Sequence, residues 1–239
     1  MFIRKAFFAA LVLLAGPALA QDTVLPSWNE GAARDAVVNF VTAATTEGNA
    51  GWIAPADCVE VRVGLSDAMR MAYATAEPDE RYRLAACAAE KLPVVERLVE
   101  RHRGEPTLVI GQYLDQLDEI VDRLGADLIT GETSVTERQR LFAAFRTGEI
   151  DLLVVSKVAN FSVDLPEASV AVQVSGTFGS RQEEAQRLGR VMRPKGDGRT
   201  AHFYTIVARD TVDAEFAAHR QRFLAEQGYA YRIVDADDV

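Results

Sequence analysis

The sequence predicts an α/β fold, in which helices cover both faces of a parallel β-sheet. From residue 107 onward, short apolar runs typical of buried strands alternate with longer segments whose apolar residues recur at helical spacing. No internal repeat or low-complexity tract interrupts this alternation. Because a helix between two strands returns the chain to the same end of the sheet, the alternation favours parallel pairing.

The expected elements follow in order along the chain. Before residue 107 we expect a strand at 58–63, a helix at 67–74, a turn at 77–80 and a long helical stretch from Arg81 with a break at Pro93. The further strands are expected at 107–111, 127–130, 151–156, 169–175, 201–208 and 229–233. The further helices are expected at 113–124, at 134–148, where Ser134 and Glu137 form a capping box, and at 211–227.

The composition is that of a globular protein. Of the 239 residues, 49% are hydrophobic and 26% are charged, which is enough for one substantial core. The net charge of -9 argues against a stand-alone nucleic-acid binder, although a local basic strip is compatible with it. Cys58 and Cys87 form no C-x-x-C pair, and the three histidines show no ligand spacing. We therefore expect two buried free thiols and no metal site.

Residues 1–20 have the pattern of a secretory signal peptide. A basic start precedes an apolar run at 6–15, which is too short for a stable membrane anchor, and small residues stand at Ala18 and Ala20. Cleavage is expected before Gln21, which predicts a periplasmic or secreted protein with no other membrane segment. The alternative is a buried N-terminal helix.

Residues 21–50 form a separate segment of foreign origin. An amphipathic helix is expected at 33–45, and together with residues 25–31 it resembles the first mature segment of secreted haloacid dehalogenase-like phosphohydrolases. In that family the next strand carries a D-x-D-x-T nucleophile motif, which residues 46–63 lack. We interpret the stretch between Glu47 and Pro55 as a chimera boundary, and we expect no phosphohydrolase chemistry.

The strongest functional signal lies at 180–195. A capping box at 180–183 predicts a helix that ends before Pro194. One face of this helix presents Gln186, Gly189, Arg190 and Arg193 at i, i+3, i+4 and i+7. Two guanidinium groups beside a glycine suit a polyphosphate, because they stay ionised and bind oxygens in pairs. The alternative is a solvated surface helix in which Glu183 pairs with Arg187.

Residues 186–193 resemble motif VI, Q-x-x-G-R-x-x-R, of superfamily 2 helicases. Residues 153–168 and 175–187 resemble the xeroderma pigmentosum group B (XPB) type of DNA repair helicase in its bacterial form, and the resemblance covers about residues 51–239. It implies a RecA-like (P-loop NTPase-type) parallel sheet, namely the C-terminal lobe of a helicase. The family function that it implies is ATP-driven unwinding of DNA with 3′ to 5′ polarity, in repair.

The resemblance implies roles for single residues. Arg190 and Arg193 would be arginine fingers for ATP with Mg²⁺, Gln186 and Gly189 would shape the helix face, and Asp164 would face the ribose or the fingers. The residues implied to lie near the DNA backbone are Gly111, Gln112, Thr133, Arg138, Ser156 and Lys157. On their own, Thr133 and Lys157 would be ordinary loop residues. Because ligands gather beyond the carboxyl ends of parallel strands, we expect several of these residues at one rim.

The motifs of a complete ATP site are absent. None of the lysines, Lys5, Lys91, Lys157 and Lys195, stands in a G-x-x-x-x-G-K-[ST] context. A first RecA-like ATPase lobe must therefore act in trans or be lost, and the chain alone is expected to hydrolyse no ATP. Whether it is an enzyme stays open. The alternatives are a secreted phosphohydrolase remnant and a non-catalytic module that docks an ATPase lobe or DNA.

The leader conflicts with the helicase resemblance. A signal peptide addresses the chain outward, whereas ATP and chromosomal DNA are inside the cell. A misjoined leader, or an internal start such as Met69, would keep the protein in the cytoplasm.

Overall fold

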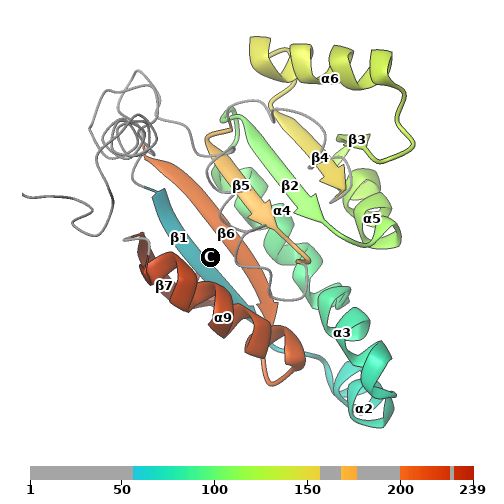
Figure 1. Ribbon diagram of the computed structural model, residues 1–239, viewed down its shortest axis with the longest axis vertical. Coiled ribbons are helices and arrows are strands. Elements are labelled where there is room, and N and C mark those ends of the chain that lie inside the picture. The colour runs from blue at the N-terminus through green and yellow to red at the C-terminus, as the bar shows by residue number, and fades with distance from the viewer. Residues whose placement is uncertain (1–55, 157–167, 177–199, 227–228) are drawn as a thin grey trace, which may run out of the picture. The chain divides into compact units, whose positions relative to one another are not determined.

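The computed structural model describes residues 56–156, 168–176, 200–226 and 229–239, which all belong to one compact unit, Ala43–Val239. These residues form a seven-stranded sheet in the order β3-β4-β2-β5-β6-β1-β7, and all neighbouring strands are parallel (Figure 1). The strands are β1 (Ala56–Val63), β2 (Thr107–Gly111), β3 (Asp127–Ile129), β4 (Leu152–Ser156), β5 (Val170–Gln173), β6 (Ala201–Ala208) and β7 (Ala230–Asp235). The predicted parallel sheet is confirmed, and each expected strand is present to within two residues at either end.

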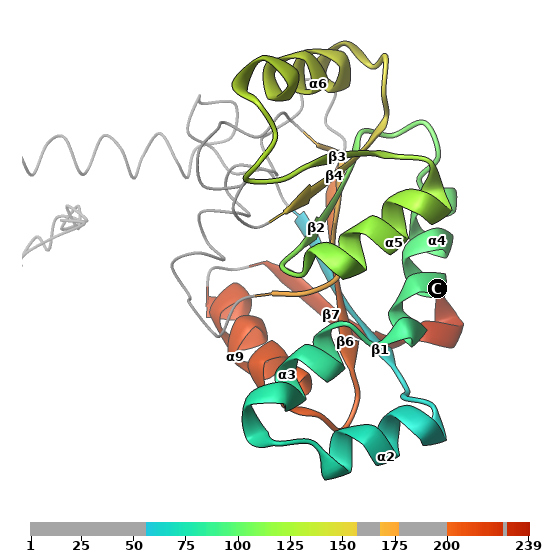
Figure 2. The same cartoon turned by 90° about the vertical axis from the view of Figure 1, so that its right-hand side faces the viewer.

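Helices cover both faces of the sheet, as predicted (Figure 2). They are α2 (Asp67–Thr75), α3 (Pro78–Ala86), α4 (Leu92–Arg101), α5 (Leu114–Leu124), α6 (Val135–Thr147) and α9 (Val212–Glu226), with short 3-10 turns η1 (Ala89–Lys91) and η2 (Ala236–Asp238). Phe142 and Phe145 of α6 pack on one face with Phe203 of β6. Leu98 of α4 and Leu117 of α5 pack on the other.

Local chemistry sets the ends of the helices. At the start of α6, Ser134 Oγ accepts a hydrogen bond from the Glu137 backbone N–H at 3.2 Å, which is the serine half of the predicted capping box. The Glu137 carboxylate accepts hydrogen bonds from Arg140. α6 ends at Gly148, whose φ of 74° is the left-handed conformation that glycine adopts without strain.

Two prolines lie differently from the prediction. The turn expected at 77–80 is the start of α3, with Pro78 in its first turn. Pro93 does not break a helix; it lies in the first turn of α4. Both outcomes have one cause, since the first turn of a helix needs no N–H from proline and favours its fixed φ.

The prediction of two buried free thiols also needs correction, because Cys58 is buried but Cys87 is only partly buried.

Candidate functional site

The carboxyl ends of β4, β2 and β5 lie side by side, because these strands are neighbours in the sheet. Gly111 at the end of β2 is in register with Ser156 at the end of β4. Ser175, just beyond β5, accepts a hydrogen bond on its Oγ from the Gln112 backbone N–H at 2.8 Å. The predicted rim therefore forms here from Gly111, Gln112, Ser156 and Ser175, and we call these four residues the rim.

Gly111 is required by packing. A Cβ at this position would lie 2.6 Å from Leu117 Cδ2 and 3.0 Å from Val174 Cγ2, both closer than ordinary contact. Leu117 is fully buried, so it has little room to move. The glycine thus allows β2, β5 and α5 to meet closely at the rim, which the sequence motif alone did not reveal.

Thr133 and Arg138 organise the loop after β3. Thr133 Oγ1 accepts a hydrogen bond from the Thr130 N–H at 2.9 Å, and Arg138 Nη2 donates to the carbonyl oxygens of Thr130 and Thr133 at 3.3 and 3.2 Å. Arg138 Nε has no hydrogen-bond partner in the described part of the chain. The side chains predicted to face DNA thus also hold their own loop in shape.

Two rim side chains carry buried polar atoms without a partner among the described residues, namely Ser156 Oγ and Gln112 Oε1. Ser156 is only 2% exposed. A buried polar atom that makes no hydrogen bond costs about 1–3 kcal/mol. A hydrogen-bonding group from outside the described residues could satisfy these two atoms.

The remaining predicted site residues are Lys157, Asp164, Gln186, Gly189, Arg190 and Arg193, and they lie outside the described residues. Their roles stay predictions. In sequence, Lys157 is the residue after Ser156, and the motif at 186–193 follows Ser175.

Sequence reasoning missed a buried polar row across β5, β6 and β1. Gln173, Thr205 and Glu60 are in register with one another, and none is more than 5% exposed. Glu60 accepts hydrogen bonds from Tyr231 Oη at 2.6 Å and from Arg62 Nε at 2.7 Å. Burial, together with the Glu60 charge, raises the pKa of Tyr231, so the phenol keeps its proton. The polar alternation in β1 signals such a row, but it equally fits a solvent-facing strand.

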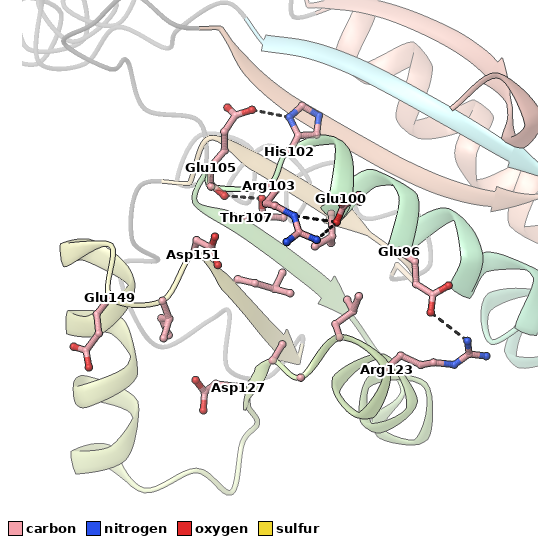
Figure 3. Close-up of a pocket in the computed structure, with 17 residues that line it drawn as sticks. Glu96, Glu100, His102, Arg103, Glu105, Thr107, Arg123, Asp127, Glu149 and Asp151 are labelled. Carbon is pink, nitrogen blue, oxygen red and sulfur yellow. Dashed lines mark hydrogen bonds and ion pairs between the residues drawn. The ribbon is translucent and has the colours of Figure 1, made fainter.

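A hollow of about 510 Å³ lies at the opposite edge of the sheet, near the amino ends of β2, β3 and β4 (Figure 3). Its acidic lining consists of Glu96, Glu100, Glu105, Asp127, Glu149 and Asp151. Arg103 pairs with Glu100, and Arg123 Nη1 lies 3.2 Å from Glu96 Oε1. More carboxylates than cations line this acidic hollow, so it repels phosphate.

Metal and membrane features were sought in the described ranges only. They contain no group of three or more side chains that could hold a metal ion. None of the helices seen there combines the length and apolar character needed to cross a membrane.

Comparison with known proteins shows that residues 48–238 match the ERCC3/RAD25/XPB C-terminal helicase family. The DNA 3'-5' helicase XPB of Kineococcus radiotolerans is 74% identical over 189 residues, which are 79% of this chain and 34% of that protein. The protein of the same name from Mycobacterium tuberculosis is 67% identical over equal shares. The general transcription and DNA repair factor IIH helicase/translocase subunit XPB of Drosophila melanogaster is 35% identical over 77% of this chain and 24% of that protein. The chain spans about a third of the length of its bacterial relatives.

Solved structures support the fold. The C-terminal domain of the DEAD-box protein Dbp5 matches with a TM-score of 0.57 and 16% identity, over 78% of this chain and 92% of that one. Dbp5 of S. cerevisiae bound to RNA and ADP BeF3 matches with a TM-score of 0.56 and 16% identity, over 85% of this chain and 49% of that one. The predicted RecA-like fold of a helicase C-terminal lobe is confirmed.

Proposed function

The chain belongs to the ERCC3/RAD25/XPB C-terminal helicase family, and from this premise we propose that it acts as the second RecA-like lobe of an ATP-dependent DNA helicase with 3′ to 5′ polarity. The observation that carries the proposal is the 74% identity to a DNA 3'-5' helicase XPB over 189 residues. In this proposal the chain completes a site whose other half belongs to a separate ATPase lobe.

The contribution to ATP hydrolysis comes from the motif at 186–193. Arg190 and Arg193 would place two permanent positive charges against the phosphates, with Gln186 and Gly189 on the same helix face and Asp164 nearby. An arginine finger contributes about 10³ to 10⁵ in rate in comparable phosphoryl transfers. ATP and Mg²⁺ would be held mainly by the other lobe, because no lysine of this chain stands in a P-loop motif.

The contribution to DNA binding comes from the rim and the loop after β3. Gly111, Gln112 and Ser156 lie at adjacent strand ends, and Thr133 and Arg138 shape the neighbouring loop. The unpartnered Ser156 hydroxyl can donate to a phosphate oxygen, a contact that fixes the register of a strand without reading its sequence, whereas Gln112 Oε1 can only accept a hydrogen bond from a donor. Lys157 would add charge to the same contact.

We further propose that residues 1–20 are a secretory leader joined, together with residues 21–50, to a helicase lobe at 51–239. The leader would send the lobe away from ATP and DNA, and either a genuine gene fusion or a misjoined reading frame would produce this combination. Sequencing the genomic locus across Glu47 to Pro55 tests this. An upstream helicase frame in place of the leader would show that the leader is misjoined, and an unbroken frame through the junction would show a genuine fusion.

The functional proposal is tested by complementation. The chain is mixed with the separately expressed remainder of the Kineococcus radiotolerans relative, and DNA-stimulated ATPase is measured. We expect activity in the mixture and none with the chain alone. Activity of the chain alone would refute the proposal, whereas binding of the two parts without hydrolysis would favour a non-catalytic docking module.

A further inference from the structure

We propose that Lys91, Asp213 and Tyr82 are positioning residues, which hold residues 174–176 at the exit of β5 and so fix where the chain that carries Arg190 and Arg193 begins. This inference deepens the proposed function and rests on it for its consequence in catalysis. The hold itself rests only on contacts within the described part of the chain.

Lys91 and Asp213 form a fully buried ion pair. Their side chains are 1% and 2% exposed, and Lys91 Nζ lies 2.8 Å from Asp213 Oδ2. Lys91 Nζ also donates a hydrogen bond to the Val174 carbonyl oxygen at 2.9 Å. Asp213 Oδ2 accepts a further bond from the Ala208 N–H at 3.2 Å, and Arg220 Nη2 stands 4.0 Å from Asp213 Oδ1. The pair therefore ties η1 and α9 to the ends of β5 and β6.

Tyr82 of α3 holds the Gly176 carbonyl group, two residues after Val174. Its buried hydroxyl donates a hydrogen bond to the Gly176 carbonyl oxygen, and its ring packs edge-on against Phe216 at a centroid distance of 5.2 Å. Burial is the main cause that raises the Tyr82 pKa, so the hydroxyl remains a donor at neutral pH. This side chain thus links α3, α9 and the residues that follow β5.

The residue between these two carbonyls is also fixed. Ser175 Oγ accepts the hydrogen bond from the Gln112 N–H at the rim, and the Val174 N–H donates to the Ile110 carbonyl oxygen at 2.9 Å. Three consecutive residues beyond β5 are therefore held by β2, the loop after it, α3 and η1. So many independent restraints on a strand exit exceed what strand pairing requires.

Stability alone does not explain the ion pair. Removing a lysine and an aspartate from water is costly, and well-packed apolar residues are often as good or better at such positions. What an apolar pair cannot supply is a donor for the Val174 carbonyl. We therefore infer that the ion pair fixes the direction in which the chain leaves the sheet toward residues 186–193. A displacement of reacting groups by about 1 Å can cost about 10²-fold in rate, so this path matters for the fingers.

The first test uses the chain alone. Tyr82→Phe removes only the hydroxyl on Gly176, and Tyr204→Phe is the matched control, because it removes an equally buried hydroxyl that contacts His102 instead. Amide hydrogen exchange is followed in peptides that cover residues 170–176. We expect Tyr82→Phe to speed this exchange about fivefold or more and Tyr204→Phe to leave it unchanged. Equal exchange rates in the two variants would refute the proposal that the Tyr82 hydroxyl holds residues 174–176.

The second test uses the reconstituted ATPase. We expect Tyr82→Phe to lower kcat about tenfold with KM for ATP nearly unchanged, because fingers act in the transition state. Tyr204→Phe should retain the kcat of the unmodified mixture. Altered exchange with an unaltered kcat would overturn the positioning role. A wild-type mixture without ATPase would instead refute the proposed function, and the exchange experiment would still decide whether Tyr82 holds the exit.

Discussion

The two edges of the sheet differ in the charge and hydrogen bonding that they offer. At the carboxyl ends of β4, β2 and β5, the rim presents a hydroxyl and an amide oxygen without partners among the described residues, and Arg138 of α6 donates hydrogen bonds to the loop after β3. At the amino ends of β2, β3 and β4, six carboxylates line the acidic hollow. The acidic hollow repels a polyanion, whereas the Ser156 hydroxyl can donate a hydrogen bond to one, so we propose that DNA binds at the first edge. The size of a hollow therefore does not by itself identify the end of the sheet that binds a polyanion.

The largest effect is expected from the motif that follows the rim. Arg193→Ala should lower kcat of the complemented ATPase by about 10³-fold, because a finger charge is lost from the transition state. Arg123→Ala in the acidic hollow is the matched control, since its guanidinium pairs with Glu96 at the other end of the sheet. Steady-state ATPase assays check both variants. Equal losses would show that the two edges do not differ in function.

Gly111→Ala tests the close packing beneath the rim. The added Cβ would press on Leu117 and Val174, so we expect a loss of about 1–3 kcal/mol in the free energy of unfolding. Gly64→Ala is the control, because its Cβ would meet only the Arg209 side chain at 3.4 Å. Urea denaturation of the chain measures both. A neutral Gly111→Ala would mean that the strands at the rim can separate freely.

Ser156 and Ser175 separate binding from stability. Ser175 Oγ accepts a hydrogen bond from Gln112, so Ser175→Ala should destabilise the chain by about 1 kcal/mol. Ser156 Oγ has no partner among the described residues, so Ser156→Ala should cost no stability but weaken DNA binding by the complemented helicase. Urea denaturation and fluorescence anisotropy with labelled DNA give the two readings. A Ser156→Ala variant that is destabilised yet binds DNA normally would contradict this assignment.

The smallest effect is expected at the amino edge, from His202. Burial lowers its pKa, with the His102 ring 5.0 Å away adding to the shift, while Asp57 opposes it at 3.7 Å. The unfolded chain then binds more protons than the folded chain below the ordinary histidine pKa of about 6.5. Stability should be fully present above that pH and should decline as the pH falls below it.

His202→Gln should flatten this pH dependence, whereas His219→Gln at an exposed position should not. The midpoints of urea denaturation, measured for each variant between about pH 5 and pH 7.5, show how far stability depends on pH around the ordinary histidine pKa. If His202→Gln and the unmodified chain showed the same pH dependence of stability, His202 would not be its cause.

Much of the fold could be predicted from local pattern. Residues 107–111 and 201–208 match their strands at both ends, because short apolar runs there are bounded by polar or turn residues. The grouping of the rim residues was predictable, because the carboxyl ends of neighbouring parallel strands lie at the same edge of the sheet. Pro78 and Pro93 misled the prediction, since proline can either end a helix or begin one, and only the packing of α3 and α4 decides.

The polar interior could not be predicted. Lys91 and Asp213 are 122 residues apart in sequence, and nothing in the periodicity of either segment pairs them. Gln173, Thr205 and Glu60 align only through strand register. Such contacts depend on the order of strands in the sheet, which a single sequence does not state.

The difference between the two edges is tested most directly by hydrogen exchange of the chain in the complemented complex, with and without DNA and ATP. Added ligands should slow exchange at Gln112, at the loop 130–134 and at residues 173–176, while residues 100–105 and 149–151 around the acidic hollow should exchange unchanged. Protection confined to the hollow, or none at the rim in an active mixture, would contradict the assignment of the carboxyl edge as the working face.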